Sequence, residues 1–307
     1  SEGLAWFVLF APALAFFGAW LLTSTISQST WVRNGVGLSY ALAAPILLLQ
    51  RDAAVLELVV HAFLPWTGYF LVKSAFAYNL ARSWRWLGLA GLSGALIAVS
   101  SPVLFALVVL VSIGLGAQRL RRLGVLVWFF VPGAALLTPW LQFIISQQAF
   151  EFLTTTSSSQ QGPISLYEQP VWLYLLVGLA LIALVGSVFR LGLAAPLWVL
   201  AIALLYTASY QPVGGSQPLL IALLLTLLVL IAASLDGLSN EKLRITGAAM
   251  LAASALASGV VFGSMQPKAF EFGLERQVPA LVLAGSDVNP GTRTLLIALE
   301  DPGIEVE

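Results

Sequence analysis

One long apolar stretch, entered from a cluster of arginines, constrains this chain more than any other feature. Residues 124–145 are almost entirely apolar; Arg119, Arg121 and Arg122 precede them, and the polar Ser146 follows. A helix needs about 20 apolar residues to cross a hydrocarbon core, and this stretch is long enough. Because loops rich in Lys and Arg stay on the cytoplasmic side, the arginines predict a cytoplasmic start and an external end for this span.

Composition places the whole chain in the same class. Hydrophobic residues make up 59% of the 307 and charged residues only 9%, whereas soluble domains carry roughly 25% charged residues. The chain is therefore expected to be a multi-pass protein of the cell membrane with lipids as its partners. Fourteen basic and fourteen acidic residues cancel, which argues against a nucleic-acid partner. The absence of cysteine excludes disulfides, thiolate metal sites and a cysteine nucleophile.

The apolar stretches predict an all-α bundle of about eight to ten membrane segments within a domain of residues 1–264. Some segments are short or broken. Residues 36–49 are interrupted by Pro45, and residues 53–72 contain Pro65, where a kink is expected. The expected spans cover residues 4–22, 36–49, 53–72, 87–116, 124–145, 171–189, 191–206, 219–235 and 245–262.

The stretch 87–116 is too long for one straight crossing and has two interpretations. It breaks at Ser100, Ser101 and Pro102, so two short helices could form a hairpin that keeps the basic residues on either side of it on the cytoplasmic face. One long tilted helix would place them on opposite faces. The hairpin is favoured, and Gly88, Gly91 and Gly94 in its first arm leave room for close helix approach.

Two segments are expected outside the cytoplasm. The loop 146–170 is rich in Ser, Thr and Gln and holds Glu151 and Glu168 but no basic residue. The tail 265–307 is more charged and contains two β-like runs and a turn. It predicts a small β-containing region that packs on the membrane face or begins a truncated soluble domain. The chain begins at Ser1 and is apolar from Leu4, which suggests a cut through a longer polypeptide.

Glu57 and His61 are the ionisable pair that lies well inside a predicted span. Four residues separate them, so a helix would place them on one face within reach of each other. Intramembrane ionisable groups are candidates for function, and a carboxylate beside an imidazole could relay protons or activate a hydroxyl. The alternative is structural: the two side chains satisfy each other or face a neighbouring helix.

Trp84, Arg85 and Trp86 form the second candidate site. Arginine pairs with phosphate oxygens and tryptophan favours the membrane interface, so this tripeptide could bind a lipid-linked phosphate. It could equally be an interfacial anchor. The external loop could shape a carbohydrate groove that runs from Trp84 and Arg85 toward residues 146–170, or could be a solvated connector.

Motifs for self-contained catalysis are missing from the sequence. Asp occurs only at positions 52, 236, 287 and 301, so there is no D-x-D for a metal-bound nucleotide. There is no Walker loop, no H-E-x-x-H, no Cys/His metal spacing and no G-x-S-x-G. The sequence therefore predicts no catalytic residue, no metal and no cofactor in this chain.

Seven stretches, in order along the chain, carry a resemblance: residues 31–33, residues 38–45, residues 83–85 with the apolar run that follows them to residues 101–103, and residues 137–141, 278–280 and 292–296. They resemble the membrane region of large actinobacterial proteins that begin with a cytosolic family 2 glycosyltransferase domain. The resemblance implies a membrane module in the synthesis of cell-envelope polysaccharide. Its partners would be a polyprenyl-linked glycan and the cytosolic glycosyltransferase domain of the same full-length protein.

The chain departs from that family at the residues that catalyse. The acidic metal-binding motif of the nucleotide-sugar domain is absent, and Arg82 stands where processive members have the Gln of Q-x-x-R-W, before Arg85 and Trp86. The expected function is therefore to bind a lipid-linked acceptor or to assist glycan export. The alternatives are a membrane transporter and a self-sufficient enzyme that uses a polyprenyl-phosphate sugar, for which Asp52 and Glu57 are the available external acids.

Overall fold

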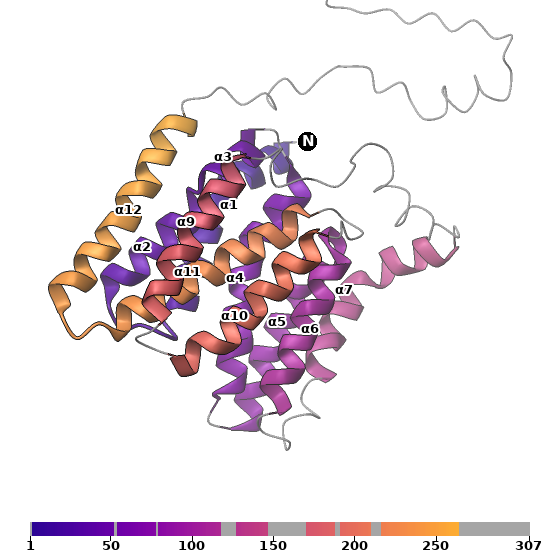
Figure 1. Ribbon diagram of the computed structural model, residues 1–307. Helices are drawn as coiled ribbons and strands as arrows, with labels where there is room; N and C mark the ends of the chain where they lie inside the picture. The colour runs from indigo at the N-terminus through magenta and orange to yellow at the C-terminus, as the bar shows by residue number, and fades with distance from the viewer. Residues whose placement is uncertain are drawn as a thin grey trace, which may run out of the picture. The chain divides into compact units, whose positions relative to one another are not determined.

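The computed structural model describes residues 2–51, 54–77, 79–117, 127–146, 170–187, 191–209 and 216–263. These ranges contain eleven α-helices and no strand (Figure 1), which confirms the all-α prediction for this part of the chain. The predicted β-containing tail, residues 265–307, lies outside the described residues, and nothing in the described ranges supports it. The helices are α1 (Glu2–Thr23), α2 (Thr30–Ala41), α3 (Ala44–Arg51), α4 (Val55–Ala75), α5 (Leu80–Ser100), α6 (Pro102–Ala117), α7 (Val127–Ser146), α9 (Pro170–Ser187), α10 (Leu191–Ser209), α11 (Gln217–Gly237) and α12 (Glu241–Gly263).

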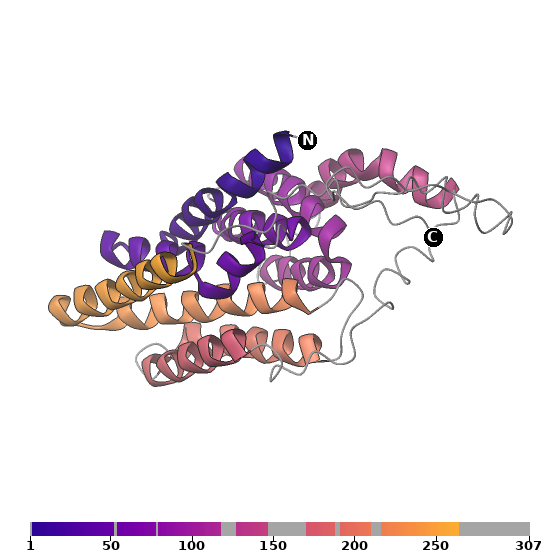
Figure 2. The same ribbon diagram turned by 90° about the horizontal axis from the view of Figure 1, so that it is seen from above.

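The most deeply buried helix is α11. Every residue from Pro218 to Ser234 is buried, and the helix packs against α9 and α10 on one side and α2 and α4 on another. Figure 2 shows it between these two groups. A helix that is apolar all round is typical of a protein core or of a membrane span. The bundle is therefore organised around α11, whereas the arginine-led span at 124–145 corresponds to α7, which packs against α5.

The prediction of a broken segment at Pro45 is confirmed. Helices α2 and α3 meet at an angle of 41° across Leu42 and Ala43, and Pro45 lies in the first turn of α3. Proline has no N–H and disfavours a helical conformation in the residue before it. Helix α2 ends before this proline, and a second helix begins at Ala44.

The broken segment stabilises two proline-containing neighbours. Proline in a helix leaves the carbonyl four residues earlier without its donor. Pro12 frees the carbonyl of Val8, which accepts a hydrogen bond from Gln50 Nε2 at 3.1 Å. Pro65 frees the carbonyl of His61, which accepts a hydrogen bond from the Tyr40 hydroxyl at 3.1 Å. Both donors come from α2 and α3, so α1 and α4 run uninterrupted through their prolines.

The chain breaks between α5 and α6 at Ser101, whose backbone is extended. Helix α7 runs parallel to α5: a Cβ on Gly88 would lie 3.7 Å from Pro132, and the Gly133 Cβ would lie 3.2 Å from the Gly91 carbonyl oxygen. Because α5 and α7 start at the same end of the bundle, α6 must run back between them. The hairpin interpretation is confirmed, and the single long helix is wrong.

Close helix approach at the glycines of α5 is also confirmed. A Cβ on Gly91 would overlap the carbonyl group of Phe129 in α7, and a Cβ on Gly94 would lie 3.2 Å from the Phe129 ring. The Phe129 side chain is buried. Small residues let helix backbones approach closely where apolar side chains would meet lipid equally well, so these glycines position α7 against α5.

The remaining helices alternate in direction. Trp172 at the start of α9 donates to Gln217 at the start of α11 at 3.1 Å, so α9 and α11 are parallel and α10 returns between them. Helix α12 runs parallel to α2, with Ser39 donating to the Leu251 carbonyl at 3.1 Å and the Gly35 backbone against Ala248. Figure 1 shows α12 beside α2 at the edge of the bundle.

These directions collect positive charge at one end of the bundle, here called the basic end, where α1 and α4 finish and α2, α5 and α12 begin. Trp66 of α4 donates to the Leu14 carbonyl of α1 at 2.9 Å, and Gly68 faces Leu22, so α1 and α4 are parallel. Of the basic residues in the described ranges, only Arg51 lies at the opposite end. The basic end holds Arg33, Lys73, Arg82, Arg85, Lys242 and Arg244.

Four of the described helices are long and apolar enough to cross a membrane, namely α1, α4, α11 and α12, and a fifth crossing results if α2 and α3 form one bent span. Four other helices of the described ranges contain shorter apolar stretches, in α6, α7, α9 and α10. The structure is that of a multi-pass helical membrane protein. The prediction of about eight to ten membrane segments requires that the shorter helices α6, α7, α9 and α10 also cross the membrane.

Candidate functional site

The α4–α5 hairpin positions the predicted tripeptide Trp84, Arg85 and Trp86 at the basic end. Helix α5 begins after Asn79, whose side-chain oxygen accepts a hydrogen bond from the Arg82 backbone at 2.8 Å. Ser83 and Ser74 are buried, and the Ser83 hydroxyl lies 3.0 Å from both the Ser74 hydroxyl and the Ser74 carbonyl oxygen. Polar contacts between buried helices fix their relative register, so the first turn of α5 is fixed against the last turn of α4.

Trp86 faces α4 and anchors the hairpin. Its ring stacks on Phe70 with centroids 5.8 Å apart and meets the edge of Tyr69 at 6.1 Å. Such aromatic pairs contribute roughly 0.5–1.5 kcal/mol beyond the area they bury. The Trp86 side chain is only partly exposed. Trp86 is therefore a structural residue of this site.

Trp84 lies on the other side of α5 and remains accessible. The residue is 37% exposed, and its ring centroid lies 5.0 Å from that of Trp128 at the start of α7. The Arg85 guanidinium lies 5.7 Å from the centroid of the Trp84 ring, within the range of a cation–π interaction. The two exposed tryptophans and the arginine form one aromatic and cationic surface.

Lys73 extends this surface on the α4 side. Its ammonium lies 5.5 Å from the centroid of the Tyr69 ring, and Tyr69 in turn contacts Trp86. Lys73, Arg82 and Arg85 are all exposed, and none of them pairs with a carboxylate in the described part of the chain. Three cations at an aromatic surface with no acidic partner leave positive charge available for an anion.

This surface, here called the aromatic–basic surface, comprises more residues than the sequence indicated. Tyr69 and Lys73 are four apart on α4, and that spacing could have placed them on one face. Trp128 could not have been assigned to this surface from the sequence, because its contact with Trp84 depends on the parallel packing of α7 on α5. The carbohydrate groove predicted from Trp84 toward the loop 146–170 leads to residues that lie outside the described ranges, as do Arg119, Arg121 and Arg122.

Glu57 and His61 do not form the predicted pair. His61 is completely buried, and both of its ring nitrogens lack a hydrogen-bond partner in the described part of the chain. Its ring packs on Tyr40 of α2 with centroids 4.4 Å apart, whereas Glu57 is partly exposed one turn earlier. The interpretation that the two side chains satisfy each other is therefore wrong, because the imidazole packs against α2.

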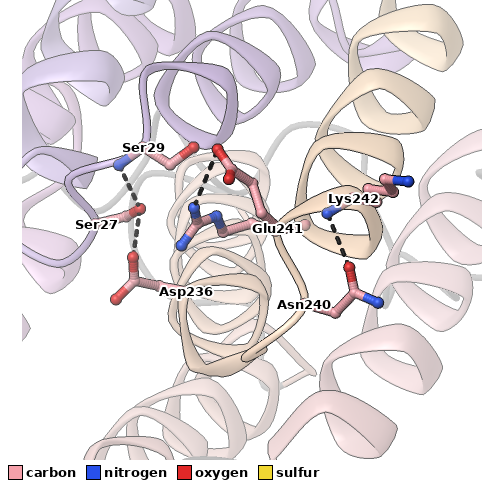
Figure 3. Close-up of polar contacts among 7 residues, drawn as sticks. Ser27, Ser29, Asp236, Asn240, Glu241 and Lys242 are labelled. Carbon is pink, nitrogen blue, oxygen red and sulfur yellow. Dashed lines mark hydrogen bonds and ion pairs between the residues drawn. The ribbon is translucent and has the colours of Figure 1, made fainter.

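A second polar group at the basic end joins the α1–α2 connection to the α11–α12 connection (Figure 3). The Ser27 hydroxyl donates to Asp236 Oδ1 at 2.7 Å and accepts from the Ser29 backbone at 3.2 Å. Arg244 and Glu241 form an ion pair within α12 at 3.9 Å. The Ser27–Asp236 bond connects residues 209 positions apart and holds the start of α2 against the end of α11.

No group of three His, Asp or Glu side chains able to hold a metal ion occurs within the described ranges. The aromatic–basic surface offers cations and π faces, which suit a phosphate attached to an apolar chain. Comparison of the chain with protein-family models, curated proteins and solved structures found no match.

Proposed function

We propose that this chain is the membrane module of a cell-envelope glycosyltransferase that holds a lipid-linked acceptor or assists glycan export, without a nucleotide-sugar site of its own. The observation that carries the proposal is the aromatic–basic surface. Lys73, Arg82 and Arg85 lie at the basic end of the bundle, have no carboxylate partner among the described residues, and lie on the surface that bears the exposed Trp84 and Trp128. A phosphate at the membrane interface would meet the cations while its hydrocarbon chain remains in the bilayer.

The identity of the acceptor follows from combining this chemistry with the sequence resemblance. An aromatic and basic interface binds anionic headgroups, and the resemblance to glycosyltransferase membrane regions indicates a polyprenyl phosphate that carries sugar. The collection of basic residues at one end supports a cytoplasmic position for this surface. The loop 146–170 and the tail would then be extracytoplasmic, and a cytosolic glycosyltransferase domain of the full-length protein would share the face that bears Trp84 and Arg85.

A binding experiment on the chain reconstituted in lipid nanodiscs tests the proposal. The probes are a radiolabelled polyprenyl phosphate, the matching polyprenol without phosphate, and phosphatidic acid. We expect saturable binding of the first, weak binding of the second, and a roughly tenfold loss of affinity when Lys73→Gln and Arg85→Gln are combined, because each removes a charge-assisted contact to phosphate.

Lys242→Gln provides the matched control, because Lys242 is exposed at the same end but lies on α12. It should leave the affinity unchanged. Equal binding of the polyprenol and the polyprenyl phosphate would contradict the proposal. Equal binding of phosphatidic acid would reduce it to a general interaction with anionic lipid.

A membrane transporter is the second candidate function, and one observation favours it. Transporters place discontinuous helices near the bilayer midplane, where unpaired backbone groups bind substrates or ions. Helices α2 and α3 form such a broken segment, and Tyr40 in the last turn of α2 packs against the buried ring of His61. Accumulation of a solute in proteoliposomes that contain the chain alone would favour this function over the acceptor-binding module.

A further inference from the structure

We infer that a stripe of aromatic side chains on α4 binds the hydrocarbon chain of the polyprenyl phosphate and selects an unsaturated isoprenoid chain over a straight saturated one. The inference rests on the function proposed above, and it adds where the lipid chain lies and which residues choose it. The stripe, here called the aromatic stripe, consists of Trp66, Tyr69 and Phe70 and ends at Lys73.

The spacing of these residues places them on one face of α4. Tyr69, Phe70 and Lys73 follow Trp66 by three, four and seven positions, the spacing of side chains that share a helix face. The three rings are half-buried and Lys73 is exposed. Because α4 finishes at the basic end, Trp66 lies about 10 Å deeper along the helix axis than Lys73. The stripe therefore runs from the basic end into the span.

The cation and the rings form one continuous surface. The Lys73 ammonium lies 5.5 Å from the centroid of the Tyr69 ring. The Tyr69 and Phe70 centroids are 5.6 Å apart, and those of Phe70 and Trp66 are 6.0 Å apart, which are contact distances for aromatic rings. Trp86 of α5 stacks on Phe70 and meets the edge of Tyr69, so it widens the surface at its outer end.

Neighbouring helices hold both ends of this surface in place. The Trp66 indole N–H donates to the Leu14 carbonyl of α1 at 2.9 Å. A Cβ on Gly18 would lie 2.7 Å from the Trp66 ring, so the ring lies directly on the α1 backbone. Trp86 is fixed by the hydroxyl contacts that join α4 to α5. A surface that is already ordered loses little conformational entropy when a ligand binds.

The depth of the stripe distinguishes it from an interfacial anchor. Tryptophan and tyrosine of an aromatic belt lie at the level of the lipid headgroups. Phe70 and Trp66 lie about one and two turns further along α4 from the basic end than Lys73, and they are in contact with each other. Anchoring at the interface does not require rings at these depths, whereas binding of a lipid chain does.

The chemistry of the surface selects a chain with one phosphate and flat segments. Lys73 has no carboxylate partner among the described residues and can pair with phosphate. An isoprene unit carries a planar double bond and a methyl branch, so it can lie flat on a ring and gain close dispersion contact. A straight saturated chain touches the same ring along a narrower line. A stripe on a single helix face suits one chain, whereas phosphatidic acid carries two.

Binding of two phosphates to the chain in nanodiscs tests the inference. The probes are polyprenyl phosphate and a straight saturated alkyl phosphate with the same number of carbon atoms. We expect polyprenyl phosphate to bind about tenfold more tightly, and Phe70→Leu to reduce this ratio to about twofold, because it removes the central ring and keeps an apolar side chain. Phe105→Leu is the matched control, since the half-buried Phe105 ring stacks on Phe129 at 5.8 Å away from the stripe. It should leave the ratio unchanged.

Three results would overturn the inference. Equal affinities of the two probes for the unsubstituted chain would show no selection. An equal loss of both affinities in Phe70→Leu would show that the ring acts only in folding. Displacement of polyprenyl phosphate by an equal concentration of phosphatidic acid would assign the stripe to bulk lipid. Both probes carry phosphate, so equal affinities would leave the proposed function standing, whereas equal binding of polyprenol and polyprenyl phosphate would contradict that function instead.

Photocrosslinking of the unsubstituted chain gives a test that needs no variant. The probe is polyprenyl phosphate with a diazirine in the isoprene unit nearest the phosphate. We expect insertion within residues 66–73 and at Trp86. Insertion spread evenly over the exposed faces of α9, α10 and α12 would show that the chain has no preferred position and would contradict the inference.

Discussion

At the scale of single residues, the roles of neighbouring side chains in Trp84-Arg85-Trp86 differ because a helix turns by about 100° per residue. Trp86 stacks on Phe70 and meets the edge of Tyr69, whereas Trp84 and Arg85 are exposed. The two interpretations of the tripeptide, as an anchor and as a binding surface, therefore apply to different residues within it. Trp86 anchors the hairpin, and Trp84 with Arg85 forms an exposed surface at the basic end.

Substitution of the two tryptophans should have different effects on stability and on binding. Trp86→Ala is expected to lower the free energy of unfolding in detergent by about 3 kcal/mol, since it removes a packed aromatic side chain. Trp84→Ala should change stability by less than about 1 kcal/mol, because its ring is partly exposed, and should weaken binding of polyprenyl phosphate. Reversed effects, with Trp84 the more important for folding, would contradict this division of roles.

Tyr40 supports a prediction about the proline in α4. Tyr40→Phe removes the donor to the His61 carbonyl, which Pro65 has already deprived of its helical partner. We expect a loss of about 1–3 kcal/mol, because a buried acceptor is left unsatisfied. Replacing Pro65 by Ala in the same background restores an N–H for that carbonyl and should recover much of the loss in a double-mutant cycle.

At the scale of helices, the packing of α7 on α5 depends on the absence of side chains at the contact. Gly91→Ala is expected to cost about 1–3 kcal/mol, since its Cβ would overlap the Phe129 backbone and the helices must separate. Gly178→Ala in α9 is the matched control, because nothing lies within 4 Å of its added Cβ. It should be neutral or stabilising by up to about 1 kcal/mol. The free energies of unfolding of the two variants, measured in mixed detergent, are compared with that of the unsubstituted chain.

The sequence predicted the helix breaks and the close approach at glycines because those depend on local chemistry. Pro45 and Ser101-Pro102 lie at the two observed breaks, where proline removes a backbone donor and restricts the residue before it, and glycine has no Cβ in any surroundings. The separation of Glu57 from His61 could not be predicted, since spacing along α4 says nothing of Tyr40 on α2. Trp128 was missed for the same reason: its contact with Trp84 arises from tertiary packing alone.

At the scale of the whole molecule, the central position of α11 was also hidden from the sequence. An apolar side chain has a similar free energy in contact with lipid and in contact with protein. The hydropathy of α11 therefore cannot show whether the helix is buried in the bundle or faces lipid. In the structure the helix directions gather Arg33, Lys73 and Arg244 with the cations of α5 at one end.

The lack of native cysteine allows the orientation to be tested with single introduced cysteines. Asn79→Cys and Asn240→Cys lie at the basic end, and both should react with an impermeant maleimide only when the cytoplasmic face is accessible. Ser158→Cys, in the predicted external loop, should react in intact cells. If Asn79→Cys were labelled from outside and Ser158→Cys only from the cytoplasm, the proposed orientation would be inverted and the phosphate site would lie on the outer face.

The burial of α11 has a consequence for biosynthesis. A ribosome completes the helices that surround α11 before it synthesises Gln217–Gly237, because chains are made from the N-terminus. Helices α1, α2, α4, α9 and α10 therefore enter the bilayer without their common neighbour. Nascent chains halted before Gln217 should be inserted yet remain loosely associated and sensitive to membrane proteases, and resistance should appear only once α11 joins them.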